Sequence, residues 1–75
     1  MWRTVTVKVN EQQFTAQIKQ YETGSNYGIG GGRISKLLLK DENGDTVANY
    51  DRGWDICPET IEQEAALETI LRAWN

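Results

Sequence analysis

The sequence predicts an α+β domain: a four-stranded antiparallel sheet made of two hairpins, followed by one C-terminal helix that packs on one face of the sheet. Three observations predict this fold. Apolar residues alternate along two consecutive N-terminal runs, an Asn-Gly pair separates two further strand-like runs, and the apolar period becomes helical near the C-terminus. The 75 residues suffice for one small core, so we expect a single domain over residues 1–75.

The first hairpin is expected between an alternating run that begins at Trp2 and a second run that ends at Tyr21. Pairing Val9 with Phe14 across a turn at residues 10–13 gathers the apolar residues of both runs on one face. The same register places Trp2 opposite Tyr21 on the other face. One side of this hairpin should therefore face the core, and the other should carry polar and aromatic side chains.

The second hairpin is predicted from Asn43-Gly44, a pair that tolerates the positive φ angles of a type I′ turn. With these two residues at the tip, Leu39 lies opposite Ala48 and Lys36 lies opposite Asp51. The alternative is a three-residue loop with the glycine in a bulge, and it would shift each pair by one residue.

The C-terminal helix is expected from Pro58 to Trp74, where apolar residues recur at helical spacing. Pro58 suits a first helical position, and Thr60 with Gln63 fits a capping box that would start the regular turns later. The apolar side consists of Ala66, Leu67, Ile70, Leu71, Ala73 and Trp74. Because one helix covers one face of such a sheet, the other face should stay open.

The open face carries the first candidate binding site. Its expected residues are Trp2, Thr4, Thr6, Lys8, Thr15, Gln17, Lys19, Tyr21, Lys36 and Leu38. Among them, Trp2, Lys19, Tyr21 and Lys36 are aromatic or basic, the types that stack on bases and contact phosphates in single-stranded nucleic acids. The simpler interpretation is a solvated surface without a ligand.

The second candidate site surrounds a glycine-rich segment, residues 24–33, that joins the hairpins and holds five of the seven glycines. It lacks the Gly-Lys-Ser/Thr of a phosphate loop and leads into a strand, so we interpret it as a flexible connector. Tyr27 and Arg33 would flank this mobile segment and order on binding. Arg52 and Trp54 complete the rim as a stacking or cation–π surface. Alternatively, Trp54 fills the gap between sheet and helix.

Catalytic and metal-binding chemistry has few candidates in this chain. There is no histidine, and the one cysteine, Cys57, allows neither an internal disulfide nor a thiolate zinc cluster. The acidic tip that begins at Asp41 has Thr46 where a calcium loop needs glycine. Glu64 and Glu68 are interpreted as a solvated acidic face. We therefore expect no enzyme activity, no cofactor and no metal site.

Charge is distributed unevenly along the chain, whose net charge is −3. Residues 1–40 carry six basic and two acidic groups, whereas residues 41–75 carry two basic and nine acidic groups. This balance argues against phosphate affinity of the whole molecule but allows a local basic face. The apolar run Leu37-Leu38-Leu39 is far too short for a membrane span, and no signal peptide is evident, so we expect a cytoplasmic protein without a membrane partner. A homodimer would help to stabilise so small a core.

Three segments resemble a known family. Residues 30–37, 41–44 and 49–55 read Gly-Gly-Gly-Arg-Ile-Ser-Lys-Leu, Asp-Glu-Asn-Gly and Asn-Tyr-Asp-Arg-Gly-Trp-Asp. In these segments the chain resembles a family of short uncharacterised proteins from Gram-positive bacteria, their phages and integrative elements. The resemblance covers most of the chain and supplies no catalytic residues. It implies an accessory role, such as regulating or inhibiting a host or element protein.

A second similarity lies in the strand that carries Tyr50, Asp51, Arg52 and Trp54 and runs into the helix. It is similar to the single-strand-binding domains of transcriptional coactivators, in which four strands precede one helix and dimers bind single strands on the sheet. This chain differs from that class in its acidic balance and in having no lysine-rich stretch before the helix.

The expected function is therefore that of a small non-enzymatic protein-interaction module, accessory or regulatory to a bacterial mobile element or phage. Its partner-binding residues would be Tyr27, Arg33, Arg52 and Trp54. The alternative is a single-stranded nucleic-acid-binding domain that uses the open sheet face.

Overall fold

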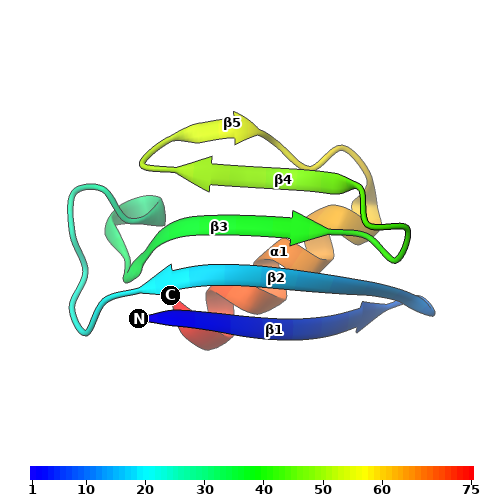
Figure 1. Ribbon diagram of the computed structural model, residues 1–75, viewed down its shortest axis with the longest axis horizontal. Helices are drawn as coiled ribbons and strands as arrows, with labels where there is room; N and C mark the ends of the chain where they lie inside the picture. Colours follow the sequence, from blue (N-terminus) through cyan, green and yellow to red (C-terminus); the bar gives the residue numbers. More distant parts are fainter.

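Five antiparallel strands lie side by side in sequence order, with a single α-helix behind them (Figure 1). The structure is a computed structural model and describes residues 1–75. The strands are β1 (Trp2–Val9), β2 (Gln12–Gln20), β3 (Ile34–Lys40), β4 (Thr46–Asp51) and β5 (Trp54–Ile56). A short 3-10 helix, η1 (Ile29–Gly31), lies between β2 and β3, and the C-terminal helix α1 spans Ile61–Trp74.

The predicted α+β class and the single C-terminal helix are confirmed, but the sheet has five strands where the sequence predicts four. The additional strand, β5, is three residues long and pairs with β4 beyond a tight turn at Arg52 and Gly53. Three residues are too few for a two-residue alternation to be visible, and Arg-Gly is not a strong hairpin pair. Local pattern alone therefore could not reveal this strand.

The first hairpin turns within two residues, Asn10 and Glu11, and both have positive φ angles of 49° and 67°. Val7 pairs with Phe14, so the predicted register, with Val9 opposite Phe14, is wrong by two residues. A two-residue turn of this kind matches the twist of the flanking strands better than the predicted four-residue turn. Because side chains alternate with a period of two, the shift leaves every residue on its predicted face.

The second hairpin combines the two predicted alternatives. In the body of the strands Leu39 lies opposite Ala48, as predicted. At the tip the register shifts by one, because Lys40 pairs with Thr46 and Gly44 adopts a φ of 84°. The three-residue loop therefore closes the hairpin. A bulge next to Lys40 then shifts the register by one, so that the strands pair as predicted from Leu39 onwards, away from the turn.

Helix α1 begins at Ile61, three residues after the predicted start at Pro58. The predicted capping box fixes this boundary: the Thr60 hydroxyl accepts a hydrogen bond from the Gln63 amide at 3.0 Å, and the Gln63 side chain accepts one from the Thr60 amide at 3.2 Å. The helix has neither the length nor the apolar character that a membrane crossing requires.

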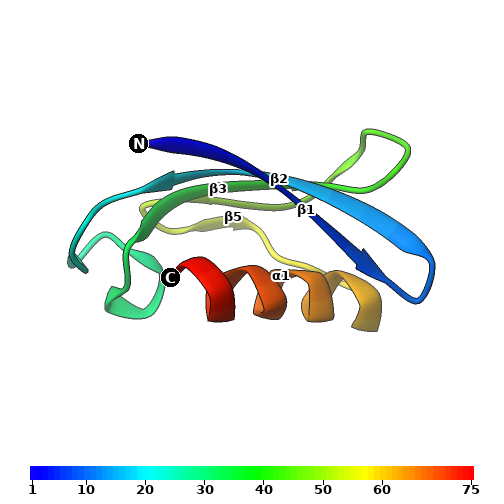
Figure 2. The ribbon, with the colours of Figure 1, turned by 90° about the horizontal axis from the view of Figure 1, so that it is seen from below.

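The core lies between the sheet and the helix, which contacts β1, β2 and β3 and lies below the sheet in Figure 2. The buried residues that fill it include Phe14, Ala16, Ile18, Leu37, Leu39, Ala66, Leu67 and Ile70. The predicted covered face is therefore confirmed. On the helix, Leu71 and Trp74 are only partly buried, and Ala73 is exposed.

Part of the glycine-rich segment, which the sequence predicts to be a flexible connector, is buried and hydrogen-bonded. Ile29 is buried within it. The Asn75 side chain donates to the Ile29 carbonyl and accepts from the Ile34 amide, both at 2.9 Å. A Cβ atom on Gly32 would lie 2.3 Å from the Asn75 amide group, and one on Gly28 would lie 1.9 Å from the Gly32 carbonyl oxygen. These glycines therefore allow a close approach of backbone and helix end.

Candidate functional site

Side chains from four neighbouring strands form a row across one end of the open face. Trp2 lies opposite Lys19, Lys19 opposite Lys36, and Lys36 opposite Asp51. The predicted pairing of Trp2 with Tyr21 is wrong, because the two-residue turn moves Lys19 into that position. The predicted pairing of Lys36 with Asp51 is confirmed, and Lys36 Nζ lies 3.8 Å from Asp51 Oδ1.

The two lysines of this row face each other directly, which is unfavourable for like charges. Lys36 is balanced in part by Asp51, whereas no carboxylate lies within ion-pair distance of Lys19. Lys19 Nζ instead lies 5.7 Å from the ring centroid of Tyr21, the residue just beyond the end of β2. This end of the open face therefore carries an uncompensated positive charge.

The pKa of the Tyr21 hydroxyl reports the same positive environment. A hydrogen bond from the Lys19 side chain and the charge of Lys19 are the main reasons why the pKa of Tyr21 lies below its ordinary value. The charge of Arg52 acts in the same direction more weakly. The pKa of Tyr21 is therefore lowered by two cations, Lys19 near the end of β2 and Arg52 in the β4–β5 turn.

Arg52 presents its guanidinium over the Tyr27 ring, with Cζ 5.1 Å from the ring centroid. Its φ angle is 60°, in the left-handed region that costs a residue with a side chain about 1–2 kcal/mol. Strain of this kind is concentrated at binding and active sites. Tyr27 is 59% exposed, so the pair forms an accessible cation–π surface.

Arg33 and Trp54 support this surface from its two sides. The Arg33 side chain donates from Nε to the Tyr21 carbonyl at 3.0 Å. Trp54 packs edge-on against Tyr50 with ring centroids 5.0 Å apart, and the Tyr50 hydroxyl donates to the Tyr27 carbonyl at 2.9 Å. Trp54 remains 40% exposed, so it supports the sheet without being fully enclosed between sheet and helix.

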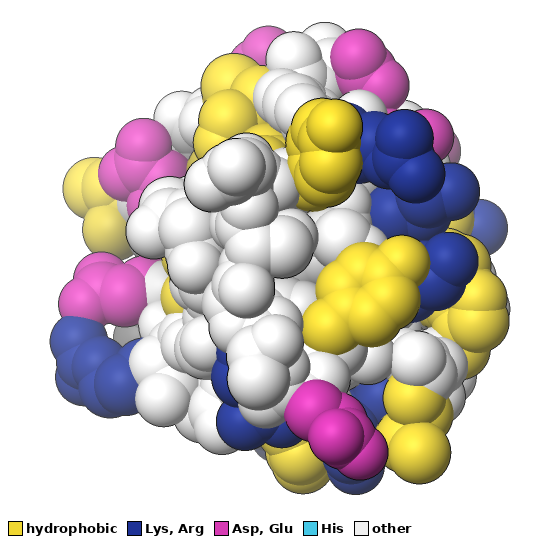
Figure 3. Space-filling view, turned by 90° about the vertical axis from the view of Figure 1, so that its left-hand side faces the viewer, with side chains coloured by type: hydrophobic (Ala, Val, Ile, Leu, Met, Phe, Trp, Pro, Cys, Tyr) yellow, Lys and Arg dark blue, Asp and Glu magenta, His cyan; other side chains and the backbone are white.

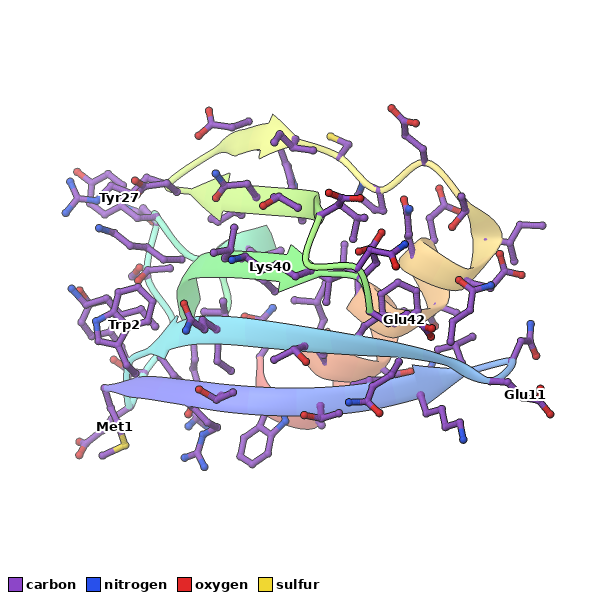
Figure 4. The ribbon with its side chains drawn as sticks, turned by 45° about the vertical axis from the view of Figure 1, so that its right-hand side comes forward. Met1, Trp2, Glu11, Tyr27, Lys40 and Glu42 are labelled. Carbon is purple, nitrogen blue, oxygen red and sulfur yellow. The ribbon has the colours of Figure 1, made fainter.

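The two predicted sites thus meet at one end of the molecule, where β1 and β3 begin and β2 and β4 end. Figure 3 shows basic side chains next to hydrophobic ones on this end, and Figure 4 shows Trp2 and Tyr27 at the same end of the sheet. We call this surface the basic–aromatic end and define it by Trp2, Lys19, Tyr21, Tyr27, Lys36 and Arg52.

The opposite end holds both hairpin tips, and Glu11 and Glu42 mark it in Figure 4. The Gln13 amide donates to Glu42 Oε1 at 2.9 Å, which ties one tip to the other. The hollow between them is lined by polar and charged residues of both signs, among them Lys40 and Asp41. Nowhere in the structure do three or more His, Cys, Asp or Glu side chains come close enough together to hold a metal ion.

The remaining sequence candidates lie apart from the basic–aromatic end. Glu64 and Glu68 are exposed on the helix, as expected, and Glu68 bonds to Arg72 one turn later. Cys57 is exposed in the segment before the helix.

Sequence reasoning missed two residues that hold the helix end against the sheet. Arg3 points to the core face of β1, and its Cζ lies 4.1 Å from the Trp74 ring centroid. Asn75 anchors the glycine-rich segment that carries Tyr27. The position of Arg3 among the valines was a visible signal, because it falls on the apolar side of the alternation.

Comparison with known proteins assigns the family. No curated protein and no solved structure matches the chain. The model of one family, described as a domain of unknown function (DUF7678), matches residues 1–75. Because this match covers the whole chain, the protein belongs to the DUF7678 family.

Proposed function

We propose that this protein is a non-enzymatic binding module that recognises a protein partner through the basic–aromatic end. We place it in the cytoplasm as an accessory or regulatory protein of a bacterial mobile element or phage. The observation that carries the proposal is the convergence of two separate sets of candidate residues on one exposed surface. The genomic setting rests on the family resemblance alone.

The composition of this surface supports a protein partner. Tryptophan, tyrosine and arginine dominate the residues that contribute most to protein–protein affinity. Here Trp2 and Tyr27 are each 59% exposed, and Arg52 lies over Tyr27. Their backbones are held by the sheet and by the Tyr50 hydrogen bond, so little conformational entropy is lost on binding.

The charge of the surface indicates the chemistry of the partner. Neither Lys19 nor Arg52 has a carboxylate within ion-pair distance, and the Arg52 guanidinium lies over the Tyr27 ring. An acidic protein surface with apolar side chains beside its carboxylates would satisfy both the cations and the exposed rings. The net charge of −3 works against a strongly charged polyanion, because the field of the whole molecule repels it at long range.

A single-stranded nucleic acid is the second candidate, and one arrangement favours it. Trp2 lies opposite Lys19 on the neighbouring strand, and the Tyr21 ring lies 5.7 Å from Lys19 Nζ. Lys36 continues the row across the open face. Bases could stack on the rings while phosphates contact the lysines. Such binding would strengthen steeply as salt is lowered.

The test compares two double variants with the same change in net charge. Lys19→Gln/Arg52→Gln removes cations from the basic–aromatic end, and Lys40→Gln/Arg72→Gln removes exposed cations elsewhere. Each is used for affinity capture from a bacterial host lysate and for binding to oligodeoxythymidylate at low and high salt. Circular dichroism checks that both variants stay folded.

We expect the wild type and Lys40→Gln/Arg72→Gln to capture the same proteins, and Lys19→Gln/Arg52→Gln to lose them. An identical set of proteins for all three would remove the proposed surface. Salt-dependent binding of the oligonucleotide that only Lys19→Gln/Arg52→Gln abolishes would establish the second candidate in place of the first.

A further inference from the structure

The geometry of β1 points to a homodimer, and we propose that this strand pairs with the β1 strand of a second copy in antiparallel orientation about a two-fold axis at Val5. The pairing would join both sheets into one continuous sheet. This inference uses the free edge of β1 and does not depend on the proposed function.

Half of the backbone groups of β1 point away from the sheet. Met1 and Gln20 exchange two hydrogen bonds, of 2.9 Å and 2.8 Å. In an antiparallel ladder such pairs alternate along the strand, so the odd residues of β1 bond to β2 and the even residues face outward. The outward N–H and C=O groups belong to Trp2, Thr4, Thr6 and Lys8.

Two charged residues, Arg3 on the core face and Lys8 on the open face, are the protection that this exposed strand carries. β1 is eight residues long and pairs with β2 without a bulge, and it contains no proline. Val5, Val7 and Val9 pack on the core but remain partly exposed along its margin. The other edge of the sheet, β5, has only three residues. The β1 edge is therefore the longer of the two.

A two-fold axis at Val5 gives the register in which every outward N–H and C=O group of β1 can form a hydrogen bond. It pairs Thr4 with Thr6 of the partner subunit, and Trp2 with Lys8 of the partner subunit. No two like charges then face each other, and the partner's Lys8 comes to the indole of Trp2, where a cation is attracted. An axis at Thr6 would instead place Trp2 opposite the hairpin turn, where the ladder has ended.

A second copy suits this edge because an antiparallel pair of identical strands is self-complementary. The contact is isologous, so it closes at two copies and leaves no further β1 edge exposed. It would also cover the margin of the three valines in a domain whose core is small. A consequence for the basic–aromatic end is that each copy receives an additional lysine, the partner's Lys8, next to Trp2.

The test measures the dimer dissociation constant by sedimentation velocity over a concentration series. Thr6→Pro removes one outward N–H without removing a bond to β2, and edge strands tolerate proline at such positions. Thr6→Ala is the matched control, since it keeps the N–H. We expect a dimer for the wild type and Thr6→Ala, and an increase in the dissociation constant of about tenfold or more for Thr6→Pro.

A charge pair tests the register without changing the backbone. Thr4→Lys/Thr6→Lys sets like charges opposite each other across the proposed interface, whereas Thr4→Lys/Thr6→Glu sets opposite charges there. We expect the first double variant to be monomeric and the second to remain dimeric. If Thr6→Pro fails to fold, this comparison still tests whether two copies pair through β1.

Two results would overturn pairing through the β1 edge, and a third would contradict its register. One is a wild-type protein that stays monomeric into the millimolar range. The other is a dimer whose dissociation constant is the same for both charge variants, because its contact must then lie elsewhere. A dimer that forms only with Thr4→Lys/Thr6→Lys would equally contradict the register.

Discussion

Replacing Asn75 by alanine should destabilise the fold strongly, although the residue lies at the end of the helix. Its side chain accepts a hydrogen bond from the Ile34 amide and donates one to the Ile29 carbonyl. Ile34 is 0% exposed, so water cannot replace the lost acceptor without a local rearrangement. The variant therefore leaves a buried donor unpaired.

The size of the effect follows from these two bonds. An unsatisfied buried donor costs about 1–3 kcal/mol, and losing the second bond adds about 1 kcal/mol, so we expect a loss of about 2–4 kcal/mol. A domain of this length has a free energy of unfolding of about 4–11 kcal/mol. Asn75→Ala would thus remove a large share of the stability.

The assay is equilibrium unfolding in urea, combined with amide hydrogen exchange at Ile34. The control is Arg72→Ala, which breaks the exposed bond to Glu68 near the same helix end and should cost less than about 1 kcal/mol. Faster exchange of the Ile34 amide should accompany the loss of stability in Asn75→Ala. Equal stabilities of the two variants, or an unchanged Ile34 exchange rate, would refute the reasoning.

Four further predictions each concern a single position. Glu11→Gly should raise the free energy of unfolding by about 0.5–1 kcal/mol, because Glu11 has a φ of 67°; a lower melting temperature would contradict the two-residue turn. Gly28→Ala should cost about 1–3 kcal/mol in urea unfolding, since its Cβ would clash with a carbonyl oxygen. Gly53→Ala, where a Cβ meets no atom within 4 Å, should change stability by less than about 1 kcal/mol. Lys19→Gln should raise the pKa of Tyr21 towards its ordinary value in a spectrophotometric titration. In the wild type, the folded chain releases this proton at lower pH than the unfolded chain, so Tyr21 contributes stability as the pH rises through that range, and Lys19→Gln should weaken this contribution.

The candidate site was predictable by residue type but not by arrangement. The sequence indicates an aromatic and basic open face on the first hairpin, and a separate rim around Tyr27 and Arg52. Nothing in the local pattern shows that both lie at one end of the sheet. That follows from the strand order, because β1 and β3 begin where β2 and β4 end. The left-handed φ of Arg52 is also invisible until the turn into β5 is known.

The register of the first hairpin shows where sequence reasoning stops. A shift of two residues keeps Val7 and Phe14 on the covered face, so hydrophobic burial is the same in both registers to a first approximation. The turn decides between the two registers. The two-residue turn is favoured because Asn10 and Glu11 adopt positive φ angles that match the twist of the strands. The pairing of Trp2 with Lys19 follows from that choice.

By itself, the sequence determined the elements whose causes are local. Alternation determined the two faces of β1 and β2, the Asn43-Gly44 pair determined the position of the second turn, and the Thr60–Gln63 capping box determined the start of the helix. Interactions of this kind join residues a few positions apart, so a short window of sequence contains all of their determinants.

Only the tertiary structure decided the fifth strand, the anchoring of the glycine-rich segment by Asn75, and the gathering of the basic and aromatic side chains at one end. Each depends on contacts between residues that are distant along the chain. The free energy of such a contact depends on where the rest of the chain already lies, and no local pattern records that.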